Sequence, residues 1–273
     1  MIEGWQWDPT LFAGTAEFYE RGRLPYAPGS LDLIGRLTGG PGRLLDAGCG
    51  PGHVAAALAP FFDEVVGLDP DPGMLAVAGA RGVGNARWVR ARAEDLPAGL
   101  GTFRAVLFAQ SFHWTDRERV AATVRGMLEP GGALVHLASQ HQPPPATTPL
   151  PLPEPPYPMI ADLVRRRLGP VRRAGQGRIA SGRTPDREDV VIAKAGFGDY
   201  ERHLVPGGQV VERDVDALVA WTFSRSDSAP HLFGEERGDV ERELRAMLTE
   251  RGGRFAEHLP PTEIRIWRTG QTR

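Results

Sequence analysis

Two carboxylates and a glycine-rich turn are the residues of this chain whose types and spacing point to chemistry. Asp46 ends a short apolar run, and glycines at 48, 50 and 52 follow it. A second carboxylate, Asp69, ends the next apolar run. Glycine lets bare backbone approach a ligand because it has no Cβ, and a helix that starts at His53 would aim its unpaired N–H groups at the same place. The pattern therefore predicts a ligand-binding turn.

The spacing of the glycines separates the classes of nucleotide that such a turn can hold. They follow G-x-G-x-G instead of the G-x-G-x-x-G of dinucleotide sites, and the Lys-Ser/Thr pair of a phosphate-binding loop is missing. Asp46 is poorly placed for a pyrophosphate but suits a ligand with an ammonium or sulfonium charge. Asp69 can accept the hydroxyls of a ribose. Together these residues predict a nucleoside that carries a cationic tail.

The elements that must position these residues alternate between strand-like and helix-like patterns over residues 31–139. This alternation predicts an α/β fold with a parallel, doubly wound sheet. We expect strands at 43–47, 64–69, 87–91, 103–109 and 133–138, and helices at 53–61, 71–80 and 116–128. The near-continuous apolar run at 103–109 is typical of a strand in the middle of a sheet that is covered on both faces.

A stretch rich in proline, residues 142–158, interrupts this pattern, because proline cannot donate to a sheet ladder. A short helix near 159–168 and an arginine-rich stretch up to Arg183 follow. We interpret this piece as an insertion that is too short and polar for a core of its own. Beyond it we expect helices at 186–195, 214–223 and 235–251, a strand pair at 200–206 and 209–213, and a last strand at 263–268.

The composition excludes several classes of protein. The chain has 273 residues and a net charge of -2, which argues against nucleic acid or an anionic membrane as a partner. Its one cysteine, Cys49, cannot form an internal disulfide, so a reduced, cytoplasmic location is expected. The first residues lack the pattern of a signal peptide, and no apolar run approaches the roughly 18 residues of a membrane span. The seven histidines show no metal-ligand spacing, so no metal site is expected.

With these motifs in view, the chain resembles the class I S-adenosylmethionine (SAM)-dependent methyltransferases. The resemblance rests on residues 44–52, 66–75, 91–97, 103–116 and 127–134, in the order and spacing of that family. It is most similar to the bacterial small-molecule branch that includes trans-aconitate methyltransferases, where a strand end like residues 109–114 recurs. The resemblance implies a mostly parallel seven-stranded sheet with an antiparallel last pair, an N-terminal helical lid and an insertion after the fifth strand.

The resemblance also implies how the chain is organised. We expect one methyltransferase domain over residues 1–273. Its parts are lid helices at 1–36, a SAM-binding core at 37–140, a Pro/Arg-rich insertion at 141–185, and at 186–273 the rest of the core with the acceptor pocket.

For the cofactor, the resemblance implies roles for individual residues. The methionine part of SAM is expected to lie along the backbone of Ala47, Gly48, Cys49 and Gly50. Asp46 is expected to influence the amino group, and Tyr19 and Gln110 to face the methionine chain. Asp69 is expected to hold the ribose, with adenine contacts from Pro70, Met74, Ala93 and Glu94. Many relatives carry an acid at the position of Arg92, so backbone groups are expected to make some of the adenine contacts here.

Methyl transfer from a sulfonium needs alignment above all, because the donor is already activated. A general base is optional, and His113, just past the fourth strand, is the candidate for that role or for shaping the pocket. The acceptor is expected to contact Phe112, His113, Trp114, His141 and Trp221, although packing explains these side chains as well. The arginines of the insertion suit an acidic acceptor or form a solvated basic face.

The sequence therefore predicts an enzyme that transfers a methyl group from SAM to a small molecule, such as an acidic metabolite or an intermediate of secondary metabolism, and leaves S-adenosylhomocysteine. Methylation at oxygen, nitrogen or carbon stays open, as does the choice between monomer and homodimer. Two alternatives remain. One is a SAM-binding module without catalysis. The other is an NAD(P)-dependent oxidoreductase, which the G-x-G-x-G spacing and the lack of a Tyr-x-x-x-Lys pair disfavour.

Overall fold

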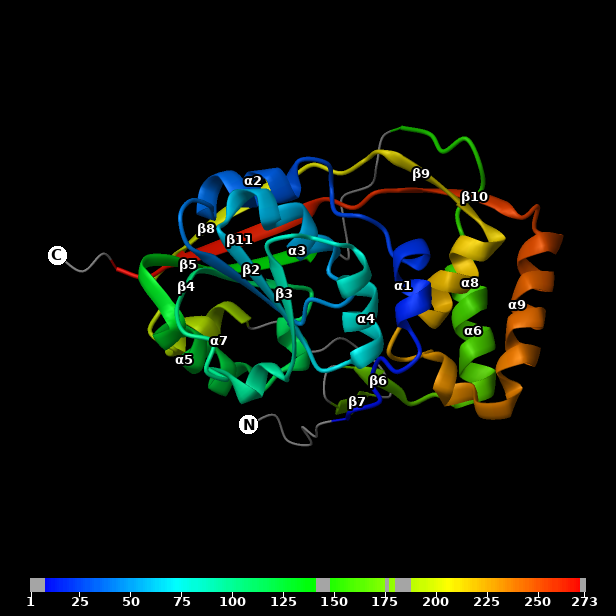
Figure 1. Cartoon of the computed structure of the whole chain (residues 1–273). Helices are drawn as coiled ribbons and strands as arrows, with labels where there is room; N and C mark the ends of the chain where they lie inside the picture. Colours follow the sequence, from blue (N-terminus) through cyan, green and yellow to red (C-terminus); the bar gives the residue numbers. More distant parts are fainter. Residues whose placement is uncertain (1–7, 141–147, 175–176, 180–187, 271–273) are drawn as a thin grey trace.

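A seven-stranded sheet forms the centre of the protein (Figure 1). The computed structural model describes residues 8–140, 148–174, 177–179 and 188–270. The strands are β1 (Arg43–Ala47), β2 (Glu64–Asp69), β3 (Ala86–Arg90), β4 (Phe103–Ala109), β5 (Leu128–Ser139), β8 (Tyr200–Val205) and β11 (Thr262–Arg268), in the spatial order β3-β2-β1-β4-β5-β11-β8. The first five pair in parallel, and β11 runs antiparallel to β5 and β8. The predicted fold class is confirmed.

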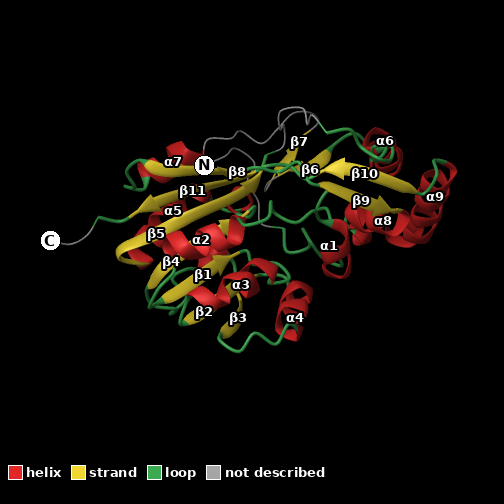
Figure 2. Ribbon diagram, turned by 90° about the horizontal axis from the view of Figure 1, so that it is seen from above, coloured by secondary structure: helices red, strands yellow, loops and turns green. Residues whose placement is uncertain are grey.

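Helices cover both faces of this sheet (Figure 2), which explains why the central strands are almost wholly apolar. In β1, Leu44 belongs to the cluster under α2 (Ser30–Thr38) and α3 (His53–Leu58), whereas Leu45 belongs to the cluster under α5 (Arg117–Met127) and α7 (Glu188–Lys194). The helix α4 (Pro72–Ala80) packs on β2 and β3. Short 3-10 helices lie at η1 (Ala59–Phe61), η2 (Ala93–Asp95), η3 (Phe112–Trp114) and η4 (Pro230–Glu236).

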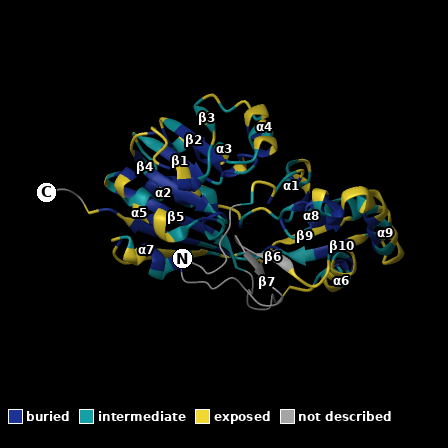
Figure 3. Cartoon of the chain, turned by 90° about the horizontal axis from the view of Figure 1, so that it is seen from below, coloured by how far each residue is buried: buried dark blue, intermediate teal, exposed yellow. Residues whose placement is uncertain are grey.

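A second group of elements packs beside the sheet, and we call it the cap (Figures 1 and 3). It consists of α1 (Ala16–Gly22), α6 (Tyr157–Leu168), α8 (Val215–Phe223), α9 (Arg237–Glu250) and a two-stranded sheet of β9 (Val210–Asp214) and β10 (Arg254–His258). A short antiparallel pair, β6 (Arg172–Ala174) and β7 (Gly177–Ile179), follows α6 in the chain.

The cap has an apolar core that the sequence did not predict. Ile160 and Leu163 of α6 are buried against Leu218 and Phe223 of α8 and Leu244 of α9. The stretch interpreted as a polar insertion therefore contributes one apolar helix face to a shared core. The interpretation missed this because the other half of the core comes from residues that follow β8, far along the chain.

The chain crosses between the sheet and the cap at two neighbouring places. Gly208 donates its amide to the carbonyl of Leu259 at 2.7 Å, and Gly207 lies so close to the carbonyls of Leu259 and Pro260 that a Cβ would overlap them. Because of this crossing, the predicted strand pair at 200–206 and 209–213 is wrong. The first strand, β8, joins the main sheet beside β11, and the second, β9, pairs with the unpredicted β10 in the cap.

Candidate functional site

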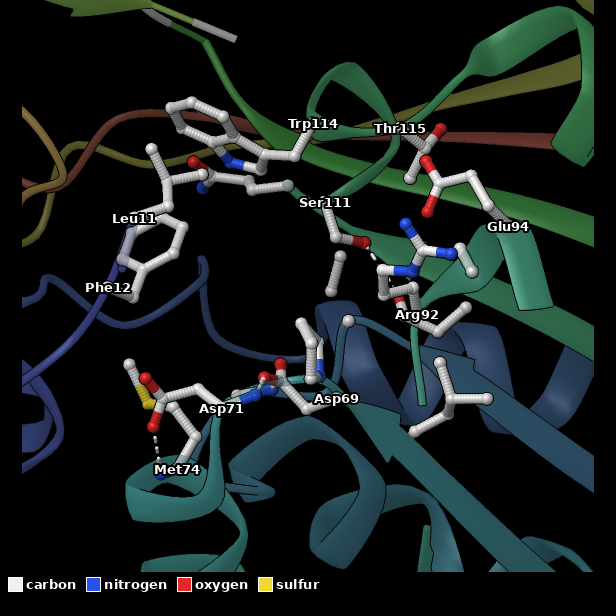
Figure 4. Close-up of a pocket in the computed structure, with 18 of the residues that line it drawn as sticks. Leu11, Phe12, Asp69, Asp71, Met74, Arg92, Glu94, Ser111, Trp114 and Thr115 are labelled. Atoms are coloured by element: carbon white, nitrogen blue, oxygen red, sulfur yellow. Dashed lines mark hydrogen bonds between the residues drawn. The ribbon is translucent and has the colours of Figure 1, made fainter. Parts of the chain in front are cut away.

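A pocket opens over the carboxyl ends of β1, β2 and β4, where both sequence-predicted carboxylates end their strands (Figure 4). Asp69, Asp71 and Met74 form one side of it, and Trp114 faces them with Leu11 and Phe12. The N-terminal segment thus lies across the mouth of the pocket. The ring of Phe12 meets that of Trp114 edge-on at 5.4 Å between centroids, which ties this segment to the end of β4.

The glycine turn is held in shape from both sides. The amides of Gly48 and Cys49 donate to the carbonyl of Leu68 at 2.7 and 3.0 Å. The carboxylate of Asp69 accepts the amide of Gly50 at 2.9 Å through one oxygen and the amide of Asp71 at 2.9 Å through the other. Asp69 therefore fixes the turn and also lines the pocket, where its remaining lone pairs can accept ligand hydroxyls.

Close packing behind the turn requires glycine at position 48. Its φ is +74°, and a Cβ there would lie 2.6 Å from the Cβ of Ser111. Ser111 has little freedom to move, because its hydroxyl donates to the carbonyl of Ala47 at 2.6 Å and its side chain is buried. The bare backbone of Gly48 is thus left open to the pocket on its other side.

We expect Gly48→Ala to lower the free energy of unfolding by roughly 2 kcal/mol or more and to weaken SAM binding at least tenfold. About 1 kcal/mol comes from the left-handed backbone and the rest from overlap with Ser111. The control is Gly82→Ala, where φ is +66° but nothing lies within 4 Å of a new Cβ. Gly82→Ala should lower the free energy of unfolding only by the contribution of the left-handed backbone, about 1 kcal/mol, and should leave SAM affinity unchanged. Thermal melts and calorimetry measure these two quantities. Equal effects of the two variants would contradict the packing argument.

The carboxyl groups of Asp46 and Asp69 are both buried, and both have raised pKa values. Asp46 is fully buried beneath the turn, and neither of its oxygens has a hydrogen-bond partner among the described residues. Burial, and then the nearby charge of Asp69, raise the pKa of Asp46 to about 7. Burial likewise raises the pKa of Asp69 to about 6. Both environments favour the neutral acids unless a positive charge binds nearby.

Side chains on the opposite wall of the pocket are engaged with the protein itself. Glu94 is buried and accepts the amide of Asp116 at 2.8 Å, so it orients the start of α5. Arg92 pairs with Asp95 at 2.7 Å. At this wall, these interactions leave backbone groups and the apolar atoms of Ala93 for contact with a ligand.

A second cavity continues from the first beyond the turn. The two share five residues, Tyr19, Gly48, Gly50, Ala109 and Gln110. The second one adds Cys49, Arg23, Tyr26, His53 and Trp221. Gln110 stands between the two with a φ of +53°, an uncommon backbone state for a side chain other than glycine.

The structure brings most of the predicted site residues together. The first pocket is lined by Tyr19, Ala47, Gly48, Gly50, Asp69, Pro70, Met74, Ala93, Glu94, Gln110 and Trp114, and the second cavity by Cys49 and Trp221. Asp46 lies behind the turn and lines neither. His141 lies outside the described residues.

Two predicted acceptor contacts lie away from these walls. Phe112 is buried in the core, with its ring 5.0 Å from that of Phe108. His113 is not among the described lining residues of either cavity, and its ring packs at 4.7 Å against Trp114. The reason is local: after Gln110 the chain turns into η3, which points Trp114 toward the pocket and Phe112 toward the sheet.

A buried polar cluster lies behind His113. Nε2 of His136 is 2.8 Å from Oε2 of Glu188, and both side chains are buried. Burial pulls the pKa of Glu188 upward, but the hydrogen bond and charge of His136, with His113 and Arg117 nearby, outweigh it and hold that pKa below its usual value. The charge of His113 is one of those that act on Glu188, so the two side chains lie near each other.

Several residues of the site were missed by the sequence reasoning. They are Leu11, Phe12 and Ser111 in the first pocket and Arg23, Tyr26 and His53 in the second. Tyr19 and Arg23 are four residues apart, so they share one side of a predicted helix, and this spacing was the available signal. His53 directly follows the glycine turn.

These walls fit an adenosine that carries an amino-acid tail. The carboxylate of Asp69 can accept the hydroxyls of a ribose, apolar atoms flank it, and the bare backbone of Gly48 and Gly50 lines both this pocket and the second cavity. Within the described part of the chain, no group of three or more His, Cys, Asp or Glu side chains is arranged to hold a metal ion.

Comparison with known proteins shows what part of the chain is similar to. Residues 45–136 match the family model described as a methyltransferase domain. The structure resembles that of a cyclopropane synthase from Mycobacterium tuberculosis, with a TM-score of 0.53, 15% sequence identity, and coverage of 96% of this chain and 95% of the other. This likeness shows the fold alone. Residues 45–136 are thus similar to a methyltransferase domain, and the whole chain shares its fold with a SAM-dependent enzyme class.

The similar sequences are methyltransferases as well. An uncharacterized methyltransferase of Mycobacterium tuberculosis is 36% identical over 123 residues, which are 45% of this chain and 49% of that protein. The trans-aconitate 2-methyltransferase of Deinococcus radiodurans is 34% identical over 103 residues, 36% of this chain and 39% of that protein. The chain thus matches about half or less of the length of these curated relatives.

Proposed function

We propose that the protein transfers the methyl group of SAM to a small-molecule acceptor and releases S-adenosylhomocysteine. The observation that carries this proposal is the glycine turn clamped by Asp69, which opens onto a pocket within the matched methyltransferase domain. When bound, SAM supplies a methyl group that its sulfonium charge already activates.

The residues of the chain then have to bind, orient and exclude water. Asp69 accepts ribose hydroxyls, and the backbone of Gly48 and Gly50 with Gln110 aligns the methionine chain. Leu11 and Phe12 cover the pocket against Trp114, which keeps water from the reacting groups. Alignment of this kind is the main source of rate for such a displacement, on the order of 7–11 kcal/mol.

The acceptor enters, in this proposal, where the second cavity meets the cap. Trp221 of α8 lines that cavity, with the ring of Tyr157 at 4.5 Å and the guanidinium of Arg225 at 4.6 Å from its ring centroid. We propose an acidic metabolite or natural-product intermediate as the acceptor, and the similarity to a trans-aconitate 2-methyltransferase supports that choice.

We further propose that the lid (1–36), core (37–140), insertion (141–185) and C-terminal part (186–273) act as one domain. In this proposal the protein works in the cytoplasm as a monomer or homodimer without a nucleic-acid partner. Among the described helices, none is both long and apolar enough to cross a membrane.

Calorimetric titration with SAM, S-adenosylhomocysteine and NAD, followed by transfer of labelled methyl to a panel of small carboxylic acids, tests this function. We expect both sulfur nucleosides to bind, NAD not to bind, and at least one acid to be labelled. Binding without transfer to any acceptor would favour a SAM-binding module, and binding of NAD alone would overturn the proposal.

His113→Asn should lower turnover tenfold or more while SAM affinity stays within twofold, if His113 takes a proton from the acceptor. Glu188 lies near this histidine, so Glu188→Gln, which removes the carboxylate charge, should alter the pH–rate profile if His113 is the base. If both variants keep the wild-type pH–rate profile, His113 is not the base and has only a structural role.

A further inference from the structure

A third cavity lies within the cap, between α6 and α8. Its volume is about 350 Å³, compared with about 110 Å³ for the first pocket and about 170 Å³ for the second cavity. Cavities that hold small molecules typically measure roughly 300–1,000 Å³. Trp221 lines both the second and the third cavity, so the two meet at its side chain.

Apolar side chains of α6 form much of the wall of this third cavity. Ile160, Val164 and Leu168 follow one another at intervals of four residues, so they share one side of the helix. Ile160 is buried in the core of the cap, whereas Val164 and Leu168 are half-buried. Val171, which follows the helix and also lines the cavity, is 50% exposed. The wall therefore has apolar surface that the described residues leave uncovered.

The polar side chains of the cavity already bind other groups of the protein. The hydroxyl of Thr222 donates to the carbonyl of Leu218 at 2.9 Å, and the hydroxyl of Ser228 donates to the carbonyl of Thr222 at 2.5 Å. Arg225 donates two hydrogen bonds, each of 2.9 Å, to the carboxylate of Asp227. A ligand carboxylate would have to displace Asp227 and leave it largely buried without its partner, which is costly.

Arg165 is the other cationic residue among the described lining residues. It pairs with Asp162 at 2.7 Å, and its side chain is 59% exposed, so solvent and salt screen its charge. The cavity therefore has no unbalanced charge to attract an ion. An uncharged apolar group would instead cover the exposed apolar wall and disturb none of these pairs.

The side chain of Trp221, where the two cavities meet, is held by two neighbours. The ring of Tyr157 and the guanidinium of Arg225 both contact the indole. The hydroxyl of Tyr157 donates to the carboxylate of Glu257 at 2.7 Å, which fixes that ring in turn. Trp221 is thus a fixed boundary, and a molecule that extends past it occupies both cavities.

We propose that the third cavity binds an uncharged, apolar part of the acceptor, such as an aromatic ring or a branched alkyl group. The proposal rests on the proposed function, and it narrows the acceptor to a molecule with two different ends. The end that receives the methyl group lies toward the second cavity, and the apolar end lies between α6 and α8. A small polycarboxylate has no part that suits this apolar wall.

Filling the third cavity tests this assignment. Val164→Phe adds apolar volume to its wall, and Met159→Phe makes a change of the same kind on α6 at a residue that lines none of the three cavities. Wild type and both variants, saturated with S-adenosylhomocysteine, are titrated with 2-naphthol and with trans-aconitate. We expect Val164→Phe to bind 2-naphthol at least tenfold more weakly than wild type, and any affinity for trans-aconitate to stay unchanged. Met159→Phe should bind both compounds as wild type does.

Methyl transfer links this binding to the acceptor. Aromatic alcohols and aromatic carboxylic acids should receive labelled methyl from SAM. Val164→Phe should raise their KM at least tenfold and change kcat less, while its affinity for S-adenosylhomocysteine stays within twofold of wild type. Label that enters only small polycarboxylates would overturn the proposal.

The binding data can overturn the proposal in three further ways. Wild type does not bind 2-naphthol, Val164→Phe binds it as tightly as wild type does, or Val164→Phe loses S-adenosylhomocysteine as well and so acts through the fold. The first two results are obtained with S-adenosylhomocysteine bound, so they leave the proposed function standing. If wild type does not bind S-adenosylhomocysteine, the proposed function itself fails, and this result does not depend on any variant.

Discussion

Asp69→Ala should weaken SAM binding by about 2–3 kcal/mol, roughly 30- to 150-fold, the largest single loss that we expect in the cofactor site. The carboxylate does two things at once. It accepts the amides of Gly50 and Asp71, each at 2.9 Å, and it lines the pocket where the ribose is proposed to lie. The variant loses the acceptor for the ligand and also leaves the two amides without their partner.

The opposite end of the same strand supplies a matched control. Asp63, just before β2, accepts the amide of Gly42 at 2.7 Å and lines neither cavity. Asp63→Ala should therefore lower the melting temperature without changing SAM affinity. Calorimetry and thermal melts of both variants separate the two roles of Asp69. If Asp69→Ala only lowers the melting temperature, as Asp63→Ala does, the ribose assignment is wrong.

The sheet and the cofactor turn were predictable because their signals are local. Apolar runs that end at Asp46 and Asp69, each followed by helix-forming residues, are enough to place β1 and β2 in a parallel sheet. The family-like order of the later segments placed β4 and β5. Even so, the side on which a residue lies depends on single backbone angles. The left-handed state of Gln110 helps decide that Trp114 faces the pocket and Phe112 the core.

The cap was not predictable for the opposite reason, since its contacts join distant parts of the chain. Arg23 and the carbonyl of Ser224 are 201 positions apart, and Tyr157 bonds Glu257 across 100 positions. A hydrophobic pattern gives the helices α6, α8 and α9, but it carries no information about which of them meet. Arg23 therefore looked like one more surface charge until the fold placed it beside the second cavity.

Asp46 should make the ligand-free protein less stable as the pH rises. Its ordinary pKa of 3.8 is raised to about 7 in the folded protein, so the folded state holds the proton more tightly than the unfolded chain. Stability should then fall between about pH 4 and pH 7 and level off above. Each pH unit between the two values costs about 1.4 kcal/mol, roughly 4 kcal/mol in all. Asp69, with a pKa of about 6, adds a loss of the same sign up to that pH.

Asp46→Asn tests this argument, because it keeps the shape of the side chain and removes the titration. The difference in unfolding free energy between variant and wild type should grow in favour of Asn from pH 5 to pH 8, while other titrating groups cancel. A constant difference would show that Asp46 stays ionised at little cost.

The raised pKa values of Asp46 and Asp69 also predict how SAM binding depends on pH. A bound sulfonium or ammonium would stabilise ionised Asp46 and Asp69, so SAM should bind more tightly at pH 8 than at pH 6 and release protons as it binds at the lower pH. Titrations in two buffers of different ionisation enthalpy measure that release. In Asp46→Asn both the release and the pH dependence should shrink to the part that Asp69 contributes. At neutral pH, ionised Asp46 and Asp69 thus destabilise the ligand-free protein but increase its affinity for a ligand with a positive charge. A neutral nucleoside such as methylthioadenosine would not gain this affinity.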